Sequence, residues 1–241
     1  MDSDTQQDAF FKLHRDLPRE GPGEPADVVW ATQQAVIGAR ARIADVGCGP
    51  GADIAALLAQ APQGEVTALD KTAQFVRAAR AIYADDPRVT VLKADMAAIH
   101  NSYDLIWCAG AVYFLGVERA LRGWRKSLTP QGCIAFSELC WFGENRPARA
   151  QALWADHTAM TDVAGVTRQI DAAGFDVIGQ RRLSDAAWEA YLTPLDARIA
   201  ALRPGADAAL TQVLDEAAEE AACWRAHRDA FGYLLSVVRP R

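Results

Sequence analysis

Short apolar segments alternate with amphipathic segments through the middle of the sequence, between residues 42 and 139. The segments with the length and composition of strands are residues 42–46, 65–70, 89–94, 103–108 and 133–139. Between the first two, Ile54, Leu57 and Leu58 recur at the spacing of a helix face. Because strands that alternate with helices need crossover connections, the pattern predicts an α/β fold: a doubly wound, mostly parallel sheet with helices on both faces.

A different pattern follows residue 141. It predicts helices at residues 146–160 and 162–173, strands at 175–182 and 231–238, and a long helical stretch at 184–229. That stretch is too long for a turn between two strands, so it predicts a helical cap over one edge of the sheet. Near the N-terminus, the Pro- and Gly-rich residues 17–25 join a short helix around residues 10–14 to a second helix near 26–37.

We therefore predict a single domain, residues 1–241, in four parts. Residues 1–38 form a helical N-terminal segment, 39–182 the core, 183–230 a helical insertion, and 231–241 the last strand.

Composition and charge restrict the partners of this domain. The net charge of −6 disfavours a phosphate backbone, and Arg119, Arg122 and Lys126 are interpreted as the solvated face of a helix. Five scattered cysteines without CxxC pairs indicate reduced thiols and no metal site. No run approaches the roughly 18 apolar residues of a membrane span, and the polar N-terminus lacks a signal core. We expect a cytoplasmic monomer or homodimer that binds neither nucleic acid nor membrane.

A glycine-rich turn follows the first predicted strand and carries the candidate chemistry. Gly47, Gly49 and Gly51 allow a sharp turn and the close approach of a ligand. About twenty residues later, Asp70 ends the second strand, where an acid can accept hydrogen bonds from ribose hydroxyls. Taken alone, this turn has two interpretations, because Gly47-x-Gly49-x-x-Ala52 also satisfies the loose dinucleotide fingerprint of nicotinamide oxidoreductases.

An ordered set of motifs over residues 43–139 resembles the class I, Rossmann-like S-adenosylmethionine-dependent methyltransferases. Asp45-Val-Gly-Cys-Gly-Pro-Gly51 matches the first motif of that family, an acid followed by alternating glycines. Asp70 and Asp95 match the acids near the ends of its second and third strands, and Asp104 matches the acid of its fourth. Residues 128–134 resemble its Leu-x-Pro-Gly-Gly turn, with Gln131 in place of the first glycine. The resemblance implies a seven-stranded sheet whose last strand is antiparallel, and S-adenosyl-L-methionine as the cofactor.

The resemblance also implies roles for individual residues. Asp45 is expected to hold the amino group of the methionine part, Asp70 the ribose, and Asp95 the adenine amino group, with Met96 packed on the adenine. The candidate cofactor-binding residues are Asp45, Gly47, Cys48, Gly49, Gly51, Asp70, Lys71, Asp95, Met96 and Cys108. Cys108 is also interpreted as a small buried residue.

Tyr113 and Glu138 are the candidate catalytic residues, after the fourth strand and at the end of the fifth. Tyr113 is expected to line the methyl pocket, or else to pack in the core. Glu138 is expected to orient or deprotonate an acceptor, or else to pair with an arginine. His14 and Arg19 lie on the segment 1–38, which resembles the lid of small-molecule methyltransferases; the alternative is a solvated surface loop.

Three functions stay open at this level. The first is methyl transfer to a small-molecule acceptor by in-line displacement, and the overall pattern is similar to the ubiquinone-biosynthesis-like type. The second is an NAD(P)-dependent oxidoreductase, although the sequence shows no Tyr or Lys motif for hydride relay. The third is a non-catalytic S-adenosylmethionine-binding protein, because binding motifs do not establish transfer.

Overall fold

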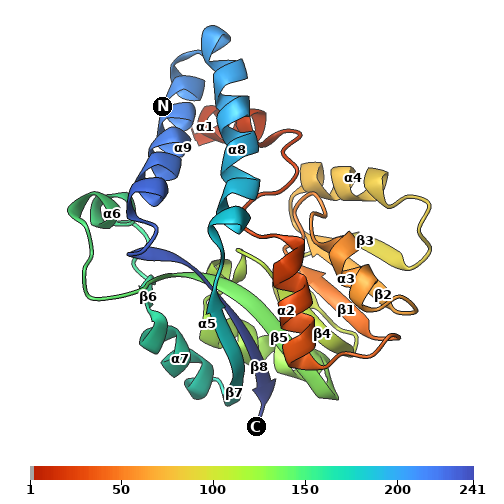
Figure 1. The fold of residues 1–241 in the computed structure, drawn as a ribbon. Coiled ribbons are helices and arrows are strands. Elements are labelled where there is room, and N and C mark those ends of the chain that lie inside the picture. Colours follow the sequence, from red (N-terminus) through yellow and green to blue (C-terminus); the bar gives the residue numbers. More distant parts are fainter. Residues whose placement is uncertain (1–2) are drawn as a thin grey trace.

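The computed structural model describes residues 3–241 as an α/β fold around one sheet (Figure 1). The sheet has the order β3-β2-β1-β4-β5-β8-β7, and β6 pairs with β5 beside this path. The strands are β1 (Arg42–Val46), β2 (Glu65–Asp70), β3 (Val89–Lys93), β4 (Tyr103–Cys108), β5 (Leu128–Trp141), β6 (Thr161–Asp162), β7 (Phe175–Arg182) and β8 (Phe231–Pro240). β8 runs antiparallel to both of its neighbours, β5 and β7, whereas β1 to β5 are parallel. The predicted fold class is confirmed, with β6 as a short additional strand.

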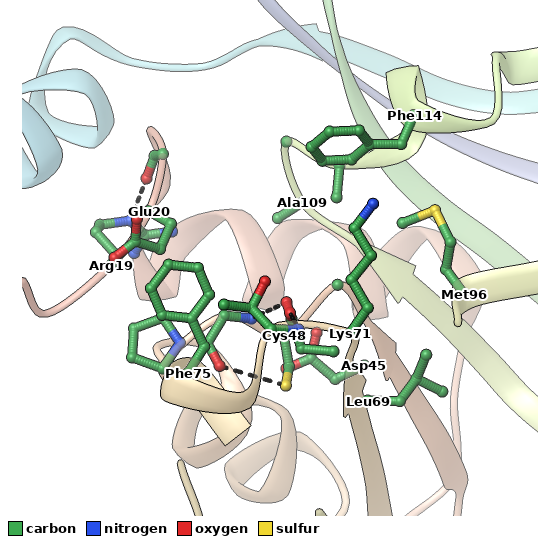
Figure 2. Close-up of a pocket in the computed structure, with 18 of the residues that line it drawn as sticks. Arg19, Glu20, Asp45, Cys48, Leu69, Lys71, Phe75, Met96, Ala109 and Phe114 are labelled. Carbon is green, nitrogen blue, oxygen red and sulfur yellow. Dashed lines mark hydrogen bonds between the residues drawn. The ribbon is translucent and has the colours of Figure 1, made fainter. Parts of the chain in front are cut away.

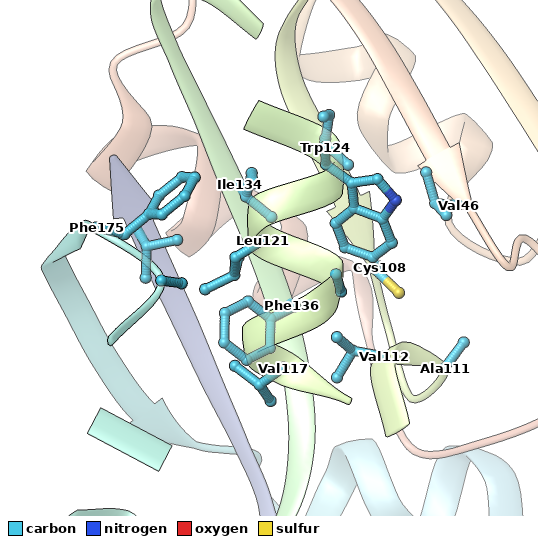
Figure 3. Close-up of a cluster of buried hydrophobic side chains, with 14 of the residues drawn as sticks. Val46, Cys108, Ala111, Val112, Val117, Leu121, Trp124, Ile134, Phe136 and Phe175 are labelled. Atoms are coloured by element: carbon cyan, nitrogen blue, oxygen red, sulfur yellow. The ribbon is translucent and has the colours of Figure 1, made fainter. Parts of the chain in front are cut away.

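Helices cover both faces of the sheet. Buried residues of α2 (Pro25–Ala35), α3 (Ile54–Gln60) and α4 (Ala73–Ile82) pack on one face with side chains such as Ile43 and Leu105. On the other face, α5 (Val117–Trp124) and α7 (Val163–Ala172) pack against Ile134 and Phe136. Figure 3 shows Trp124 and Leu121 of α5 within this second cluster. The apolar residues of these helices therefore bury both faces of the sheet.

A third buried cluster forms a helical cap. It joins α1 (Ser3–His14), α6 (Ala148–Leu153), α8 (Asp185–Leu202) and α9 (Ala208–His227) to the ends of β5 and β8. Figure 1 shows α8 and α9 rising side by side beyond the sheet, with α1 beside them. Leu13 and Leu17 are buried in this cluster. The N-terminal segment is consequently tied to the cap by apolar packing, a connection that the sequence pattern did not predict.

Two predicted boundaries are wrong. Residues 146–160 were expected to be one helix, but α6 ends at Leu153, and the chain then turns to bring Thr161 and Asp162 beside Cys140 and Trp141. The fifth strand was expected at residues 133–139, whereas β5 begins at Leu128, which pairs with Tyr103, and continues beside β8 as far as Trp141. Both differences come from pairing between segments far apart in the sequence, which local periodicity does not report. Within residues 3–241, no helix is both long and apolar enough to cross a membrane.

Candidate functional site

A cavity of about 300 Å³ opens at the carboxyl ends of β1, β2 and β4 (Figure 2). Its floor is the glycine-rich turn after β1, and one wall is the segment from Ala94 to Met96 after β3. The opposite side is closed by Phe10 and Phe11 of α1 and by the loop that follows α1. In a doubly wound sheet this edge is where ligands bind, so the cavity occupies the expected place.

The glycines of this turn have no side chains, which leaves room for a ligand against the backbone. The conformation of the turn also requires glycine. Gly47 and Gly49 have φ angles of 74° and 52°, a region that residues with a Cβ rarely adopt. A Cβ on Gly47 would also lie 2.7 Å from the Cβ of Ala111. The amides of Gly47 and Cys48 both donate to the carbonyl of Leu69, at 2.8 and 3.0 Å, and thereby join the turn to the end of β2.

Asp70 is fixed at the end of β2 by the backbone around it. Its Oδ2 accepts from the amide of Gly49 at 3.1 Å, and its Oδ1 accepts from the amide of Thr72 at 2.7 Å. The carboxylate therefore lies between the glycine turn and the start of α4, on the cavity wall. A ribose hydroxyl can donate to the remaining lone pairs of these oxygens.

Asp45 is buried on the cavity floor, and one of its carboxyl oxygens has no hydrogen-bond partner among the described residues. Its side chain is 3 % exposed, and the oxygen without a partner is Oδ2. Burial, reinforced by the charges of Asp53 and Asp70, holds the pKa of Asp45 well above its usual range, while Arg19 opposes this shift. A buried polar atom without a partner is costly, so a cationic or hydrogen-donating ligand group is the natural complement of this carboxyl.

The wall after β3 is built by a short 3₁₀ turn, Met96–Ala98. Asp95 caps this turn by accepting from the amide of Ala97 at 2.8 Å. The core residue Trp124 donates its indole N–H to the carbonyl of Met96 at 2.8 Å, which fixes the turn to α5. Asp95 and Met96 therefore both line the cavity on a supported segment.

His14 and Arg19 both lie on the cavity wall, where His14 contacts Glu20 and Arg19 pairs with Asp53. His14 Nδ1 lies 2.6 Å from Glu20 Oε2, and its ring stacks on Phe10 with 4.0 Å between centroids. Arg19 Nη2 lies 3.4 Å from Asp53 Oδ1, while Trp107 donates its indole N–H to Asp53 Oδ2 at 2.9 Å. These contacts connect the N-terminal segment directly to the turn below the cavity.

Three residues from the predicted site do not line the cavity. Cys108 is fully buried in the core. Gly51 lies under the turn, with its carbonyl accepting from the Tyr83 hydroxyl at 3.2 Å, so its role is packing. Glu138 is buried on β5, and its neighbour in sequence, Ser137, accepts a hydrogen bond from the amide of Gly110 at 2.8 Å.

Sequence reasoning missed several residues of the cavity. Asp53 and Glu20 reach it through their contacts with Arg19 and His14. The rings of Phe11, Phe75 and Phe114 form apolar walls, and Figure 2 shows Lys71 reaching toward the Phe114 ring, 5.1 Å from its centroid. Of these residues, only Asp53 could have been found from the sequence, because it lies two residues after the last glycine of the motif.

Tyr113 lies on the cavity wall, whereas Glu138 is buried on β5. Tyr113 is 38 % exposed, toward the cavity. Burial raises the pKa of Glu138 to about 8, and its Oε2 has no hydrogen-bond partner within residues 3–241. Within residues 3–241 Glu138 makes no ion pair with an arginine, so the alternative role predicted for it is not observed. A carboxyl with such a pKa can exchange a proton near neutral pH.

Comparison with known proteins identifies the central segment. Residues 43–132 match the family described as "Methyltransferase domain". The match spans β1 to the start of β5 and contains the glycine turn, Asp70 and Asp95. It bears out the predicted methyltransferase assignment and favours it over the oxidoreductase.

Solved structures share the fold of residues 43–132 and of the segments around them. A SAM-dependent methyltransferase from Geobacter sulfurreducens, in complex with S-adenosyl-L-homocysteine, has a TM-score of 0.80 and 18 % identity, covering 97 % of this chain and 98 % of its own. A SAM-dependent methyltransferase from Thiobacillus denitrificans, in the same kind of complex, has a TM-score of 0.77 and 19 % identity, covering 96 % and 98 %.

The [4+2]-cyclase SpnF shares the fold as well, with a TM-score of 0.74, 19 % identity and coverage of 98 % of this chain and 94 % of its own. This fold therefore occurs with more than one reaction, as is general for common folds. A comparison with curated protein sequences gives no match.

Proposed function

We propose that this protein uses S-adenosyl-L-methionine to methylate a small-molecule acceptor. The observation that carries the proposal is the buried carboxyl of Asp45, whose Oδ2 has no hydrogen-bond partner among the described residues, at the glycine turn of the segment that matches the methyltransferase family. S-Adenosylmethionine is a cation with an ammonium group, and a dinucleotide would instead bring a pyrophosphate anion to this turn. Complexes of the Geobacter and Thiobacillus proteins with S-adenosyl-L-homocysteine support the same ligand class.

The residues of the cavity fit such a ligand in its separate parts. Asp45 would hold the ammonium group, Asp70 the ribose hydroxyls and Asp95 the adenine amino group, with Met96 against the adenine. When bound, S-adenosylmethionine supplies an electrophilic methyl group. Arg19 and Glu20, on the loop above the turn, would exclude water from this group. Tyr113 would line the methyl pocket.

Glu138 is the proposed general base, which takes a proton from the compound that is methylated. It is buried on β5, and this burial gives it the proton affinity of a general base near neutral pH. Alignment of the acceptor with the methyl group supplies a large part of the catalysis in such displacements. The protein therefore needs few chemical groups beyond one base and a shaped, dry pocket.

Replacing Asp70 by alanine is expected to weaken S-adenosylmethionine binding by about tenfold or more, since a hydrogen bond to a charged group contributes roughly 1.5–3 kcal/mol. Calorimetry with the purified variant measures this change. Asp85→Ala is a matched control, because Asp85 is exposed beyond the end of α4. Equal affinities for parent and Asp70→Ala would contradict the assignment of Asp70 to the ribose.

Turnover separates an enzyme from a non-catalytic binding protein. Incubation of the protein with S-adenosylmethionine and a pool of small acceptors is expected to release S-adenosyl-L-homocysteine faster than incubation without acceptors. Mass spectrometry of the pool then identifies the methylated compound. Tight binding with no release across chemically diverse pools would contradict the proposal and favour the non-catalytic alternative.

A further inference from the structure

A cluster of acidic and phenolic side chains lies where the sheet meets the cap, beside the cavity. We call Tyr113, Glu138, Tyr191, Glu220 and Tyr233 the acidic corner. They come from five separate elements: the 3₁₀ turn Val112–Phe114, β5, α8, α9 and β8. Only the complete fold brings them together, and most of them have no place in the cofactor cavity described above.

The acidic corner borders the cavity through the loop after β4. Tyr113 and Gly110 both line the cavity. A Cβ on Gly110 would lie 3.9 Å from the Tyr233 hydroxyl, so that hydroxyl lies directly behind the cavity wall. Glu138 on β5 is in register with Leu234 on β8, the residue that follows Tyr233. An acceptor in this position would lie next to the methyl pocket.

Electrostatic interactions within the acidic corner are repulsive. Burial raises the pKa of Tyr113 to about 12, and the charges of Glu138 and Glu220 contribute to this shift. The pKa values of Tyr191 and Tyr233 are raised by burial first, and further by Glu220. Burial raises the pKa of Glu220, and His14 has the opposite effect and lowers it.

Unpaired polar atoms mark the same region. Glu138 is 6 % exposed, and its Oε2 has no protein partner in the described chain. On the far side of Tyr113, the His157 ring lies 5.5 Å away, centroid to centroid, and Trp154 lies 6.1 Å beyond it. His157 Nε2 and Trp154 Nε1 are also buried, and neither atom has a hydrogen-bond partner among residues 3–241. Several buried hydrogen-bonding groups near Tyr113 are thus free to bind a polar ligand.

We infer that the acidic corner binds the amino group of a small primary or secondary amine, which is the methyl acceptor. An ammonium group would be attracted by Glu138 and Glu220 and by the faces of the tyrosine rings. A carboxylate or phosphate acceptor would meet like charge. The inference rests on the proposed methyl transfer and narrows its acceptor class.

The corresponding reaction balances with groups already named. The ammonium form transfers one proton to the Glu138 carboxylate, giving a neutral amine with a free lone pair. That lone pair forms the carbon–nitrogen bond as the carbon–sulfur bond of the donor breaks, and the electron pair of the broken bond stays on sulfur. The products are a methylated ammonium ion and a neutral thioether, and Glu138 then releases its proton to solvent.

Calorimetry on the protein saturated with S-adenosyl-L-homocysteine tests the acceptor class without relying on turnover. The probes are two pairs of matched shape: 2-phenylethylamine with 3-phenylpropionate, and butylamine with pentanoate. We expect at least one amine to bind at least about tenfold more tightly than its matching acid, because a charge-assisted contact contributes roughly 1.5–3 kcal/mol. Equal or tighter binding of the acids, or no amine binding, would overturn the inference.

Two glutamates of α9 provide a matched pair of variants. Glu220→Gln is expected to weaken amine binding by about tenfold or more, whereas Glu216→Gln leaves it unchanged, because Glu216 is exposed on the same helix. Glu138→Gln gives a second measure from a different element. Unchanged amine affinity in both Glu220→Gln and Glu138→Gln, with homocysteine-product binding intact, would also overturn the inference. Failure of the parent to bind S-adenosyl-L-homocysteine at all would instead contradict the proposed function.

Discussion

Replacing Glu138 by glutamine is expected to lower turnover by about a hundredfold or more, the range in which general bases act, while S-adenosylmethionine binding stays unchanged. Glutamine keeps the shape of the side chain but cannot accept the proton. In the parent, turnover is expected to rise with pH and to level off above about 8, where the Glu138 carboxyl is ionised. Initial rates at several pH values, on both sides of 8, measure both effects.

Thermal stability provides an independent measurement on the same variant, because Glu138→Gln is expected to lower turnover but to raise stability. Burial raises the pKa of Glu138 in the folded protein, so folding favours the protonated form. The carboxyl therefore destabilises the fold progressively as pH rises from the unfolded pKa towards 8. Glu138→Gln is expected to unfold at higher temperature than the parent at pH 9, and at nearly the same temperature at pH 4.

The control for both measurements is Glu144→Gln, which alters an exposed glutamate shortly after β5. It is expected to match the parent in rate and stability. A Glu138→Gln protein that turns over at the parental rate, with a parental pH profile, would remove Glu138 from the mechanism. The higher stability alone would then show only that the carboxyl is buried.

Asp45→Asn is expected to weaken S-adenosylmethionine binding by about tenfold to a hundredfold, since charge-assisted hydrogen bonds contribute roughly 1.5–3 kcal/mol. The same change removes a buried carboxyl whose pKa is raised by burial and by Asp53 and Asp70. The protein without ligand is therefore expected to become more stable near neutral pH. Calorimetry and thermal unfolding in the absence of ligand give the two results.

Lower affinity together with higher stability in Asp45→Asn would show that this carboxyl binds the ligand and does not support the fold. If Asp45 only supported the fold, its replacement would lower stability, and affinity would fall as a secondary effect. Asp85→Asn, an exposed aspartate, is the control for nonspecific charge effects. Loss of both stability and affinity in Asp45→Asn would contradict the role proposed here.

The sequence predicted the core of this fold because the core signals are local. The ranges 42–46, 65–70, 103–108 and 175–182 coincide with β1, β2, β4 and β7. The first three are short, mostly buried runs between turns, and buried parallel strands typically have this form, whereas β7 is a more exposed edge strand that pairs antiparallel with β8. The glycine turn and Asp70 were likewise found together, because a strand, a turn and a helix follow one another without interruption.

The remainder depends on contacts between distant segments. The predicted helix at residues 146–160 stops at Leu153 because the chain must reach β5 as β6, and Asp156, His157 and Thr158 have weak helix propensity. Arg19 meets Asp53 across 34 residues. The acidic corner joins Tyr113 to Glu220 only through the folded cap. Residue type and position at the ends of the fourth and fifth strands made Tyr113 and Glu138 candidates, and the surroundings that define their chemistry come from tertiary structure.

Calorimetry of the purified protein with S-adenosylmethionine, and separately with NADH and NADPH, tests the central claim most directly. We expect micromolar binding of S-adenosylmethionine alone, and an affinity weakened by about tenfold to a hundredfold in Asp45→Asn. Binding of a nicotinamide dinucleotide instead would contradict the account, and would mean that the glycine turn and Asp70 serve a dinucleotide.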